Sequence, residues 1–268
     1  MSDSRLDSPY ARLNYRRLIA WPARIEREGP FLERQLALAP QPSVIDLGCG
    51  TGEHARHLAS RGFRTVGVDR SSALIAEARE YQGEFPPCGP DFVCGDLTEL
   101  AALTDERFGA AICLGNVLPH LEDAALEAML EAVASRLHGN GRLVLQIINY
   151  ERVLSRDERH LPLNFRAHPE RPEDEIVFLR LMKRDGARHV RFFPSTLALR
   201  PGEEPPLTIE ATKEIRLRAW RLSELEAVVA KRGLSIDGRY GDMSLTAFDA
   251  EDSTDLILTA TLDTEASA

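Results

Sequence analysis

Hydrophobic and polar positions follow a regular alternation over the first half of the chain. Short apolar runs with the length and bounding turn residues of buried strands cover residues 43–47, 65–68, 91–94, 110–114 and 142–148. The segments between them include helix-like stretches at residues 52–60, from Ser71 or Ser72 onward, and at residues 122–137. Strands that alternate with helices predict a parallel sheet with helices on both faces.

The pattern changes after residue 150 to strand-like alternation. Residues 175–182 and 188–193 have a period of two and are joined through Asp185-Gly186, a dipeptide typical of tight hairpin turns. Further alternating stretches at residues 207–211 and 214–220 extend an antiparallel unit. The chain then returns to a helix and two strands, at residues 223–232, 236–240 and 255–262.

These segments predict an α/β fold with a doubly wound, mostly parallel, seven-stranded sheet of Rossmann-like type. We expect an N-terminal helical cap and an antiparallel β insertion after the fifth strand. The predicted units are a cap at residues 1–40, a core at residues 41–150 and 218–268, and an insertion at residues 151–217 that serves as a substrate lid. Within the cap, helical spacing runs from about residue 9 to 37 and breaks at Gly29-Pro30.

The composition of the chain excludes several kinds of binding partner. The net charge of −9, from 33 basic and 42 acidic residues, repels phosphate backbones, so we expect no nucleic-acid partner. No apolar run approaches the roughly 20 residues of a membrane helix, and the first residues lack the order of a signal peptide. A cytoplasmic location without a membrane partner is therefore expected. The four cysteines form no C-x-x-C pair, which predicts no metal site.

The most informative motif follows the first strand. The segment from Val44 to Gly52 reads VIDLGCGTG, with Asp46 before glycines at alternating positions. Glycines let a backbone turn sharply and approach a ligand closely. The spacing differs from the Gly-x-Gly-x-x-Gly of dinucleotide folds, and an acid here accepts hydrogen bonds from a cationic ligand but repels a diphosphate. The motif therefore favours S-adenosylmethionine over NAD.

The other strand ends carry polar residues that agree with this ligand. In an open α/β sheet, ligands bind at the carboxyl ends of the strands. Asp69 follows the second strand and has two oxygens for two ribose hydroxyls, and Asp96 follows the third, placed for an adenine amino group. The fourth and fifth strands are followed by Leu114, Gly115, Asn116, His120, Asn149 and Tyr150.

With these motifs the chain resembles the class I S-adenosylmethionine-dependent methyltransferases over nearly its whole length. Residues 44–52, 67–71 and 94–97 look like the first three motifs of that class. Residues 112–121 and 149–154 are similar to segments of glycine and glycine/sarcosine N-methyltransferases, which also carry an antiparallel insertion at this point.

The resemblance implies roles for individual residues. Asp69 holds the ribose, Asp96 and Leu97 the adenine, and the glycine loop the methionine moiety, while Arg24 contacts the cofactor carboxylate and Tyr15 helps to close the lid. The implied cofactor-binding set is Tyr15, Arg24, Asp46, Gly48, Cys49, Gly50, Gly52, Asp69, Arg70, Gly95, Asp96, Leu97, Leu114 and Asn116.

One departure concerns the methyl acceptor. The glycine enzymes have an arginine immediately before the Asn-Tyr pair, and it grips the substrate carboxylate. Here that position is Ile148, which cannot form the bidentate ion pair of an arginine. The acceptor, an amine or a hydroxyl compound, therefore stays open.

Methyl transfer from a sulfonium is a direct displacement, so alignment and desolvation of the acceptor are the main tasks. The candidate catalytic residues are His120 as a base for an oxygen acceptor, Asn116 as an orienting amide, and Tyr150 beside the insertion. Each also has a structural interpretation, as packing or capping. Trp220 either packs in the core or closes the pocket.

Three classes of function compete. A methyltransferase for small molecules agrees with the insertion and the acidic balance. A methyltransferase for protein or RNA requires a basic or peptide-binding surface, which the sequence does not indicate. A non-catalytic or NAD-type Rossmann protein is the third. The oligomeric state has no signal in the sequence.

Overall fold

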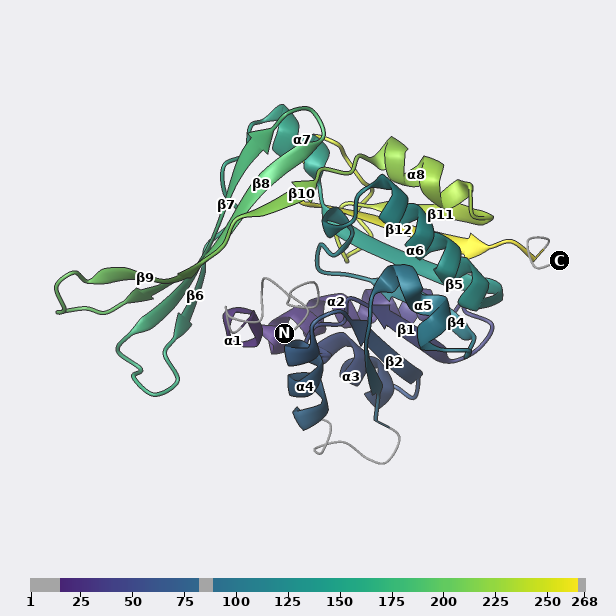
Figure 1. Ribbon diagram of the computed structural model, residues 1–268, viewed down its shortest axis with the longest axis horizontal. Helices are drawn as coiled ribbons and strands as arrows, with labels where there is room; N and C mark the ends of the chain where they lie inside the picture. The colour runs from purple at the N-terminus through teal and green to yellow at the C-terminus, as the bar shows by residue number, and fades with distance from the viewer. Residues whose placement is uncertain (1–14, 82–88, 265–268) are drawn as a thin grey trace.

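A computed structural model describes residues 15–81 and 89–264 of the chain (Figure 1). Its main sheet has seven strands in the order β11-β12-β5-β4-β1-β2-β3, and β12 runs antiparallel to both of its neighbours. The strands are β1 (Ser43–Leu47), β2 (Arg64–Asp69), β3 (Asp91–Cys94), β4 (Phe108–Cys113), β5 (Leu137–Ile148), β11 (Leu234–Tyr240) and β12 (Asp255–Leu262). The predicted fold class, a mostly parallel seven-stranded α/β sheet, is confirmed.

Helices cover both faces of this sheet. The longer ones are α2 (Trp21–Leu36), α3 (Glu53–Ser60), α4 (Ser72–Glu80), α6 (Asp123–Arg136) and α8 (Leu222–Ala230), and the short ones are α1 (Tyr15–Leu18), α5 (Leu100–Leu103) and α7 (Tyr150–Ser155). Apolar residues of α2 and α3 pack on one face, while those of α5, α6 and α8 pack on the other. Within the described residues, no helix is long and apolar enough to cross a membrane.

Helix α2 continues through the predicted break. Pro30 lies inside the helix and is exposed, so the carbonyl that it leaves without a helical donor can be hydrated. Gly29 is buried against α3, because a Cβ there would stand 2.7 Å from Nε2 of His57. The predicted break was therefore wrong: this Gly-Pro pair permits close helix packing instead of a turn. The part of the predicted cap before residue 15 lies outside the described residues.

A second, antiparallel sheet projects away from the core after β5 (Figure 1). Its strands are β6 (Asn164–Ala167), β7 (Glu175–Asp185), β8 (His189–Leu199), β9 (Leu207–Thr212) and β10 (Ile215–Arg218). The predicted antiparallel insertion and its Asp185-Gly186 turn are present, with Gly186 at φ 77°. We call this sheet the arm; the predicted unit boundaries at residues 40, 150 and 217 stay predictions.

Two further boundaries differ from expectation. Strand β5 begins at Leu137, directly after α6, and its register with β4 shifts between Phe108 and Ala110. The glycine-containing stretch therefore belongs to an irregular strand start, which apolar periodicity does not detect. Helix α7 was not predicted; it begins because Oδ1 of Asn149 accepts hydrogen bonds from the backbone N–H groups of Glu151 and Arg152.

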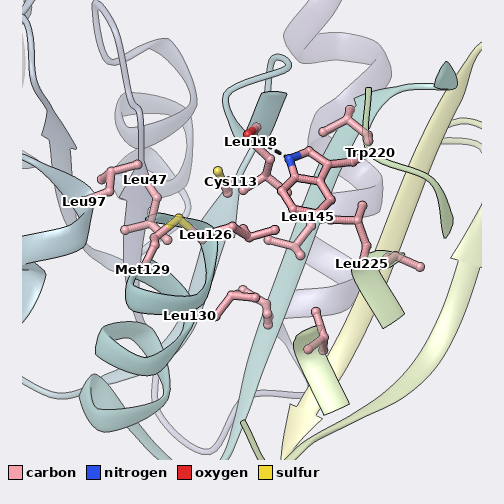
Figure 2. Close-up of a cluster of buried hydrophobic side chains, with 14 of the residues drawn as sticks. Leu47, Leu97, Cys113, Leu118, Leu126, Met129, Leu130, Leu145, Trp220 and Leu225 are labelled. Atoms are coloured by element: carbon pink, nitrogen blue, oxygen red, sulfur yellow. Dashed lines mark hydrogen bonds between the residues drawn. The ribbon is translucent and has the colours of Figure 1, made fainter. Parts of the chain in front are cut away.

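Trp220 belongs to the core rather than to a pocket wall (Figure 2). Its side chain is buried among leucines of β5, α6 and α8, and the guanidinium of Arg218 lies 4.2 Å from the ring centroid. The indole Nε1 donates to the backbone carbonyls of Leu118 and Leu121, both at 3.3 Å. The ring thus connects the root of the arm to the short 3-10 turn η4 (Leu118–His120).

We expect Trp220→Phe to lower the free energy of unfolding by about 1–3 kcal/mol, because two carbonyls lose a donor and the core loses volume. Urea unfolding measures this. Trp21→Phe is the matched control, since Nε1 of Trp21 makes no hydrogen bond and its loss removes no such contact. Equal losses in the two variants would contradict the role of the indole N–H.

Candidate cofactor and acceptor site

The site lies at the carboxyl ends of the parallel strands, where the strand order reverses. Strand β1 is central and pairs in parallel with β2 on one side and β4 on the other. The chain therefore winds away from β1 in opposite directions, which opens a crevice at this edge. The structure brings the predicted strand-end residues together here.

The glycine loop after β1 has three glycines with positive φ, at 74° for Gly48, 56° for Gly50 and 83° for Gly52. Two of them are required by packing. A Cβ on Gly48 would stand 2.5 Å from Val117, and one on Gly52 would stand 2.3 Å from the ring of Phe92. A Cβ on Gly50 would meet nothing within 4 Å. Gly50 thus faces open space that a ligand can enter.

Asp69 ties this loop to the end of β2. Its Oδ2 accepts the Gly50 N–H at 3.0 Å and its Oδ1 accepts the Ser71 N–H at 2.8 Å. Burial raises the pKa of Asp69, which these two hydrogen bonds oppose. Each oxygen keeps a lone pair, so the carboxylate can still accept hydroxyl donors. The next residue, Arg70, is exposed.

Asp46 is the buried acid beneath the loop. It is 2% exposed, and its Oδ2 is buried without a hydrogen-bond partner. Burial, with the nearby charge of Asp69, raises the pKa of Asp46 to about 6, although His54 opposes the shift. An ionised carboxylate with an unsatisfied oxygen favours a positively charged ligand.

Helix α2 supplies Arg24 and Glu28, which form a buried network with α3. Nε of Arg24 lies 2.9 Å from Glu28, and Nε2 of His54 lies 2.8 Å from the same carboxylate. Burial alone raises the pKa of Glu28, but the hydrogen bond with His54 and the charge of Arg24 lower it to about 2. Nη2 of Arg24 lies 3.8 Å from where a Cβ on Gly115 would stand. Arg24 therefore lies beside the end of β4, as its predicted role requires.

At the end of β3, the side chains of Asp96 and Leu97 make structural contacts, and the backbone is left for a ligand. Oδ1 of Asp96 accepts the N–H and the hydroxyl of Thr98 at 2.9 and 2.8 Å, and thereby caps a short 3-10 turn. The side chain of Leu97 packs in the core (Figure 2), which leaves its backbone for the predicted adenine contact. The Gly95 N–H donates to the carbonyl of Asp69 at 3.0 Å.

Cys49 and Leu114 also face inward. The Cys49 thiol packs against Gly67, where a Cβ would lie 2.8 Å from its sulfur, and burial raises the pKa of the thiol. Leu114 is 5% exposed and packs with the α2 side of the core. Tyr15 begins α1; its predicted contact with the cofactor stays a prediction.

The ends of β4 and β5 are held together by Asn116. Its backbone has φ 68°, its Nδ2 donates to the hydroxyl of Tyr150 at 3.0 Å, and its Oδ1 accepts the Ile148 N–H at 3.1 Å. Tyr150 is 1% exposed, and burial raises the pKa of its hydroxyl. The two predicted residues therefore form one rigid unit, in which the phenol stays protonated.

His120, the candidate base, ends η4. Burial, and in addition the charge of Arg70, lowers the pKa of His120 to about 4. The imidazole is therefore neutral at physiological pH, and it is a weaker base than an ordinary histidine.

Four polar residues of this edge were missed in the sequence: Glu28, His54, Gln146 and Asp255. Gln146 carried a signal, since it is polar within a buried strand, and its Oε1 accepts the Gly115 N–H at 2.7 Å. Arg24 and Glu28 have the four-residue spacing of a helical ion pair. Asp255 begins an antiparallel strand, and only the strand order reveals that its first residue lies at this edge.

Comparisons with known proteins agree with this geometry. A methyltransferase domain model matches residues 44–141. The chain is 31% identical over 195 residues to a glycine/sarcosine N-methyltransferase of Parasynechococcus marenigrum (strain WH8102), covering 66% of each chain. It is 30% identical over 186 residues to one of Aphanothece halophytica, covering 66% of this chain and 69% of that one. The structure of the CcbJ methyltransferase from Streptomyces caelestis superposes with a TM-score of 0.69 at 23% identity, covering 89% and 90%.

The chain belongs to the class I S-adenosylmethionine-dependent methyltransferases. Within that class it lies near the glycine/sarcosine N-methyltransferase group, and its cofactor is S-adenosyl-L-methionine. The residues present fit this cofactor: the orphaned oxygen of Asp46 suits its positive charge, and the open space at Gly50 admits it without a Cβ in the way.

We expect Gly50→Ala to weaken binding of S-adenosylhomocysteine by about tenfold or more, because the new methyl group enters the ligand space. An alanine at position 50 must also adopt the left-handed backbone conformation of the glycine, which lowers the free energy of unfolding by roughly 1–2 kcal/mol. Gly62→Ala is the matched control: Gly62 also has positive φ and open surroundings, but it lies at the far end of α3. Calorimetric titration of both variants decides. Similar affinities would show that the space at Gly50 is not ligand space.

Proposed function

We propose that this methyltransferase transfers a methyl group to a nitrogen of a small-molecule amine. The observation that carries the proposal is the state of two titratable groups, His120 after β4 and Tyr150 after β5. His120 is a weakened base and Tyr150 is a buried, protonated phenol bonded to Asn116. Neither group suits the deprotonation of a hydroxyl acceptor, whereas an amine that arrives neutral needs no base. The names of both curated relatives, which are N-methyltransferases, support the same acceptor atom.

The positions of the residues support the proposed cofactor-binding roles. When bound, S-adenosylmethionine supplies a methyl group already activated by its sulfonium. Asp69 accepts the ribose hydroxyls, Asp96 and the backbone of Leu97 meet the adenine, and Arg24 pairs with the carboxylate. The ionised oxygen of Asp46 balances the positive charge at the methionine end, in a buried setting where that charge is poorly screened.

Asn116 and Tyr150 orient the acceptor. Their mutual hydrogen bond and the Ile148 N–H fix the amide, so the polar wall beside the acceptor cannot rotate. The wall would hold the acceptor nitrogen with its lone pair toward the methyl group that the bound cofactor would supply for direct displacement. The proton of the resulting ammonium leaves to solvent.

Two features narrow the acceptor. Ile148 stands at the start of this wall and offers no cation to a carboxylate, so glycine itself is not the proposed acceptor. The net charge of −9 disfavours RNA as the alternative, macromolecular acceptor.

S-Adenosylhomocysteine should raise the melting temperature of the protein and NADH should not. Asp69→Ala should weaken the affinity of the protein for S-adenosylhomocysteine by about 10- to 100-fold. The variant loses the ribose contacts and the hydrogen bond that anchors Gly50 together. Asp91→Ala is the control, since this exposed carboxylate begins β3 at the opposite edge of the sheet. Stabilisation by NADH alone would reject the proposed function.

With an accepted amine as substrate, we expect His120→Ala to keep kcat within about twofold at neutral pH, since no proton is abstracted. Asn116→Ala should lower kcat by roughly 10- to 100-fold, because the acceptor wall loses its fixed position. Release of labelled methyl product measures both rates. If His120→Ala were as slow as Asn116→Ala, a base would be required and a hydroxyl acceptor would be favoured.

A further inference from the structure

Asp255 is a carboxylate at the rim of the site that the roles above do not use. It begins β12 and lies opposite Ile148, the last residue of β5. Because β12 runs against its neighbour, its first residue lies at the edge where the parallel strands end. The backbone is fixed there: the Asn149 N–H donates to the carbonyl of Thr254 at 3.0 Å, and the Asp255 N–H donates to that of Gly241 at 3.2 Å.

The side chain of Asp255 lies on the α2 side of the sheet. Residues paired across two strands share a face, as do residues two apart on one strand. Gln146 pairs with Ile257, and Asp255 lies two residues before Ile257, so these three residues share a face. Ile257 packs with α2, which identifies that face. It is the side from which Arg24 and Glu28 reach the site.

Gln146 positions the Asp255 carboxylate. The Oε1 of Gln146 accepts the Gly115 N–H, so its amide N–H₂ is the group that donates to Asp255. The charged groups that face Asp255 are Glu28, Arg24 and Arg27, all from α2. Glu28 is already bonded by Arg24 and His54, and its negative charge opposes that of Asp255.

In these surroundings, the negative charge of the Asp255 carboxylate is incompletely compensated by positive groups. Burial raises the pKa of its carboxyl to about 6, and the hydrogen bond from Gln146 does not offset the effect. The group is therefore ionised at neutral pH, but in a setting that a further cation makes more favourable. The residue keeps partial access to solvent, so a ligand can reach it.

We propose that Asp255, positioned by Gln146, binds a positively charged group of the methyl acceptor and thereby selects cationic acceptors over neutral or anionic ones. The ammonium donates a charge-assisted hydrogen bond to the carboxylate. The role is binding and not proton transfer. The inference rests on the proposed function, because it names the acceptor class of the same site.

The test uses the full chain saturated with S-adenosylhomocysteine and three probes of equal length. 1,3-Diaminopropane carries a second cation, 3-aminopropan-1-ol a neutral hydroxyl, and β-alanine a carboxylate. We expect the wild-type protein to bind the diamine about tenfold more tightly than the amino alcohol, and β-alanine most weakly. Nuclear magnetic resonance titration gives the three dissociation constants.

Asp255→Asn keeps the shape of the side chain and the contact with Gln146 but removes the charge. It should bind the diamine and the amino alcohol with equal affinity. Asp252→Asn is the matched control, because Asp252 lies three residues earlier with its side chain 81% exposed and should leave the preference unchanged.

Two results would overturn the inference while leaving the proposed function intact. One is a wild-type protein that binds S-adenosylhomocysteine but shows no preference for the diamine. The other is a loss of S-adenosylhomocysteine affinity in Asp255→Asn, which would assign the carboxylate to the cofactor. The wild-type preference decides even if the variant fails to fold. Failure of the wild-type protein to bind S-adenosylhomocysteine would instead reject the proposed function itself.

Discussion

The site depends on how one carboxylate holds two strand ends. Asp69 accepts the N–H of Gly50 with one oxygen and the N–H of Ser71 with the other, so the loop after β1 and the start of α4 share an anchor. Gly48 and Gly52 meanwhile pass so close to Val117 and Phe92 that any side chain there would push the loop off β2. The carboxylate proposed to bind the ribose and the loop proposed to bind the methionine moiety therefore form one mechanical unit.

The carboxylates at the same edge of the sheet differ in how far nearby positive groups compensate their charge. Glu28 is fully compensated by Arg24 and His54, and its pKa is held near 2. The carboxyls of Asp46, which is buried, and Asp255, which is partly buried, have in contrast pKa values of about 6. A dinucleotide site presents amide donors to an anion. This crevice presents under-compensated carboxylates, which suits a sulfonium cofactor and an ammonium-bearing acceptor alike.

Local pattern was sufficient for much of the fold. Strands β3 and β12 begin and end at the residues predicted from the apolar runs. A buried strand requires apolar side chains at consecutive positions, so its limits can be predicted from the local sequence. The continuation of α2 through Pro30 and the early start of β5 depend on partners distant in sequence, namely His57 and Phe108. Propensity alone does not contain that information.

The site divides in the same way. The loop glycines and the strand-end acids could be proposed from the sequence because tight turns and ligand contacts restrict residue type locally. Glu28, His54 and Asp255 were missed because their proximity arises only when α2 and α3 pack on one face of the sheet and β12 pairs with β5 within it. Gln146 lies between these two groups of residues. A polar residue in a buried strand indicates that it has a hydrogen-bond partner, but the sequence does not identify that partner.

The attachment of the arm has a consequence for how such an enzyme diversifies. Strand β10 ends at Arg218, whose buried guanidinium donates to Glu224 at 2.6 Å and to Asp123 at 3.2 Å while it covers the ring of Trp220. This joint fixes the root of the arm to α6 and α8, on the side of the sheet opposite to Arg24 and Asp46. The arm is also attached to the N-terminal helices, because Phe178 of β7 is buried together with Leu18 of α1. Sequence changes along the arm are therefore tolerated only where they preserve both attachments.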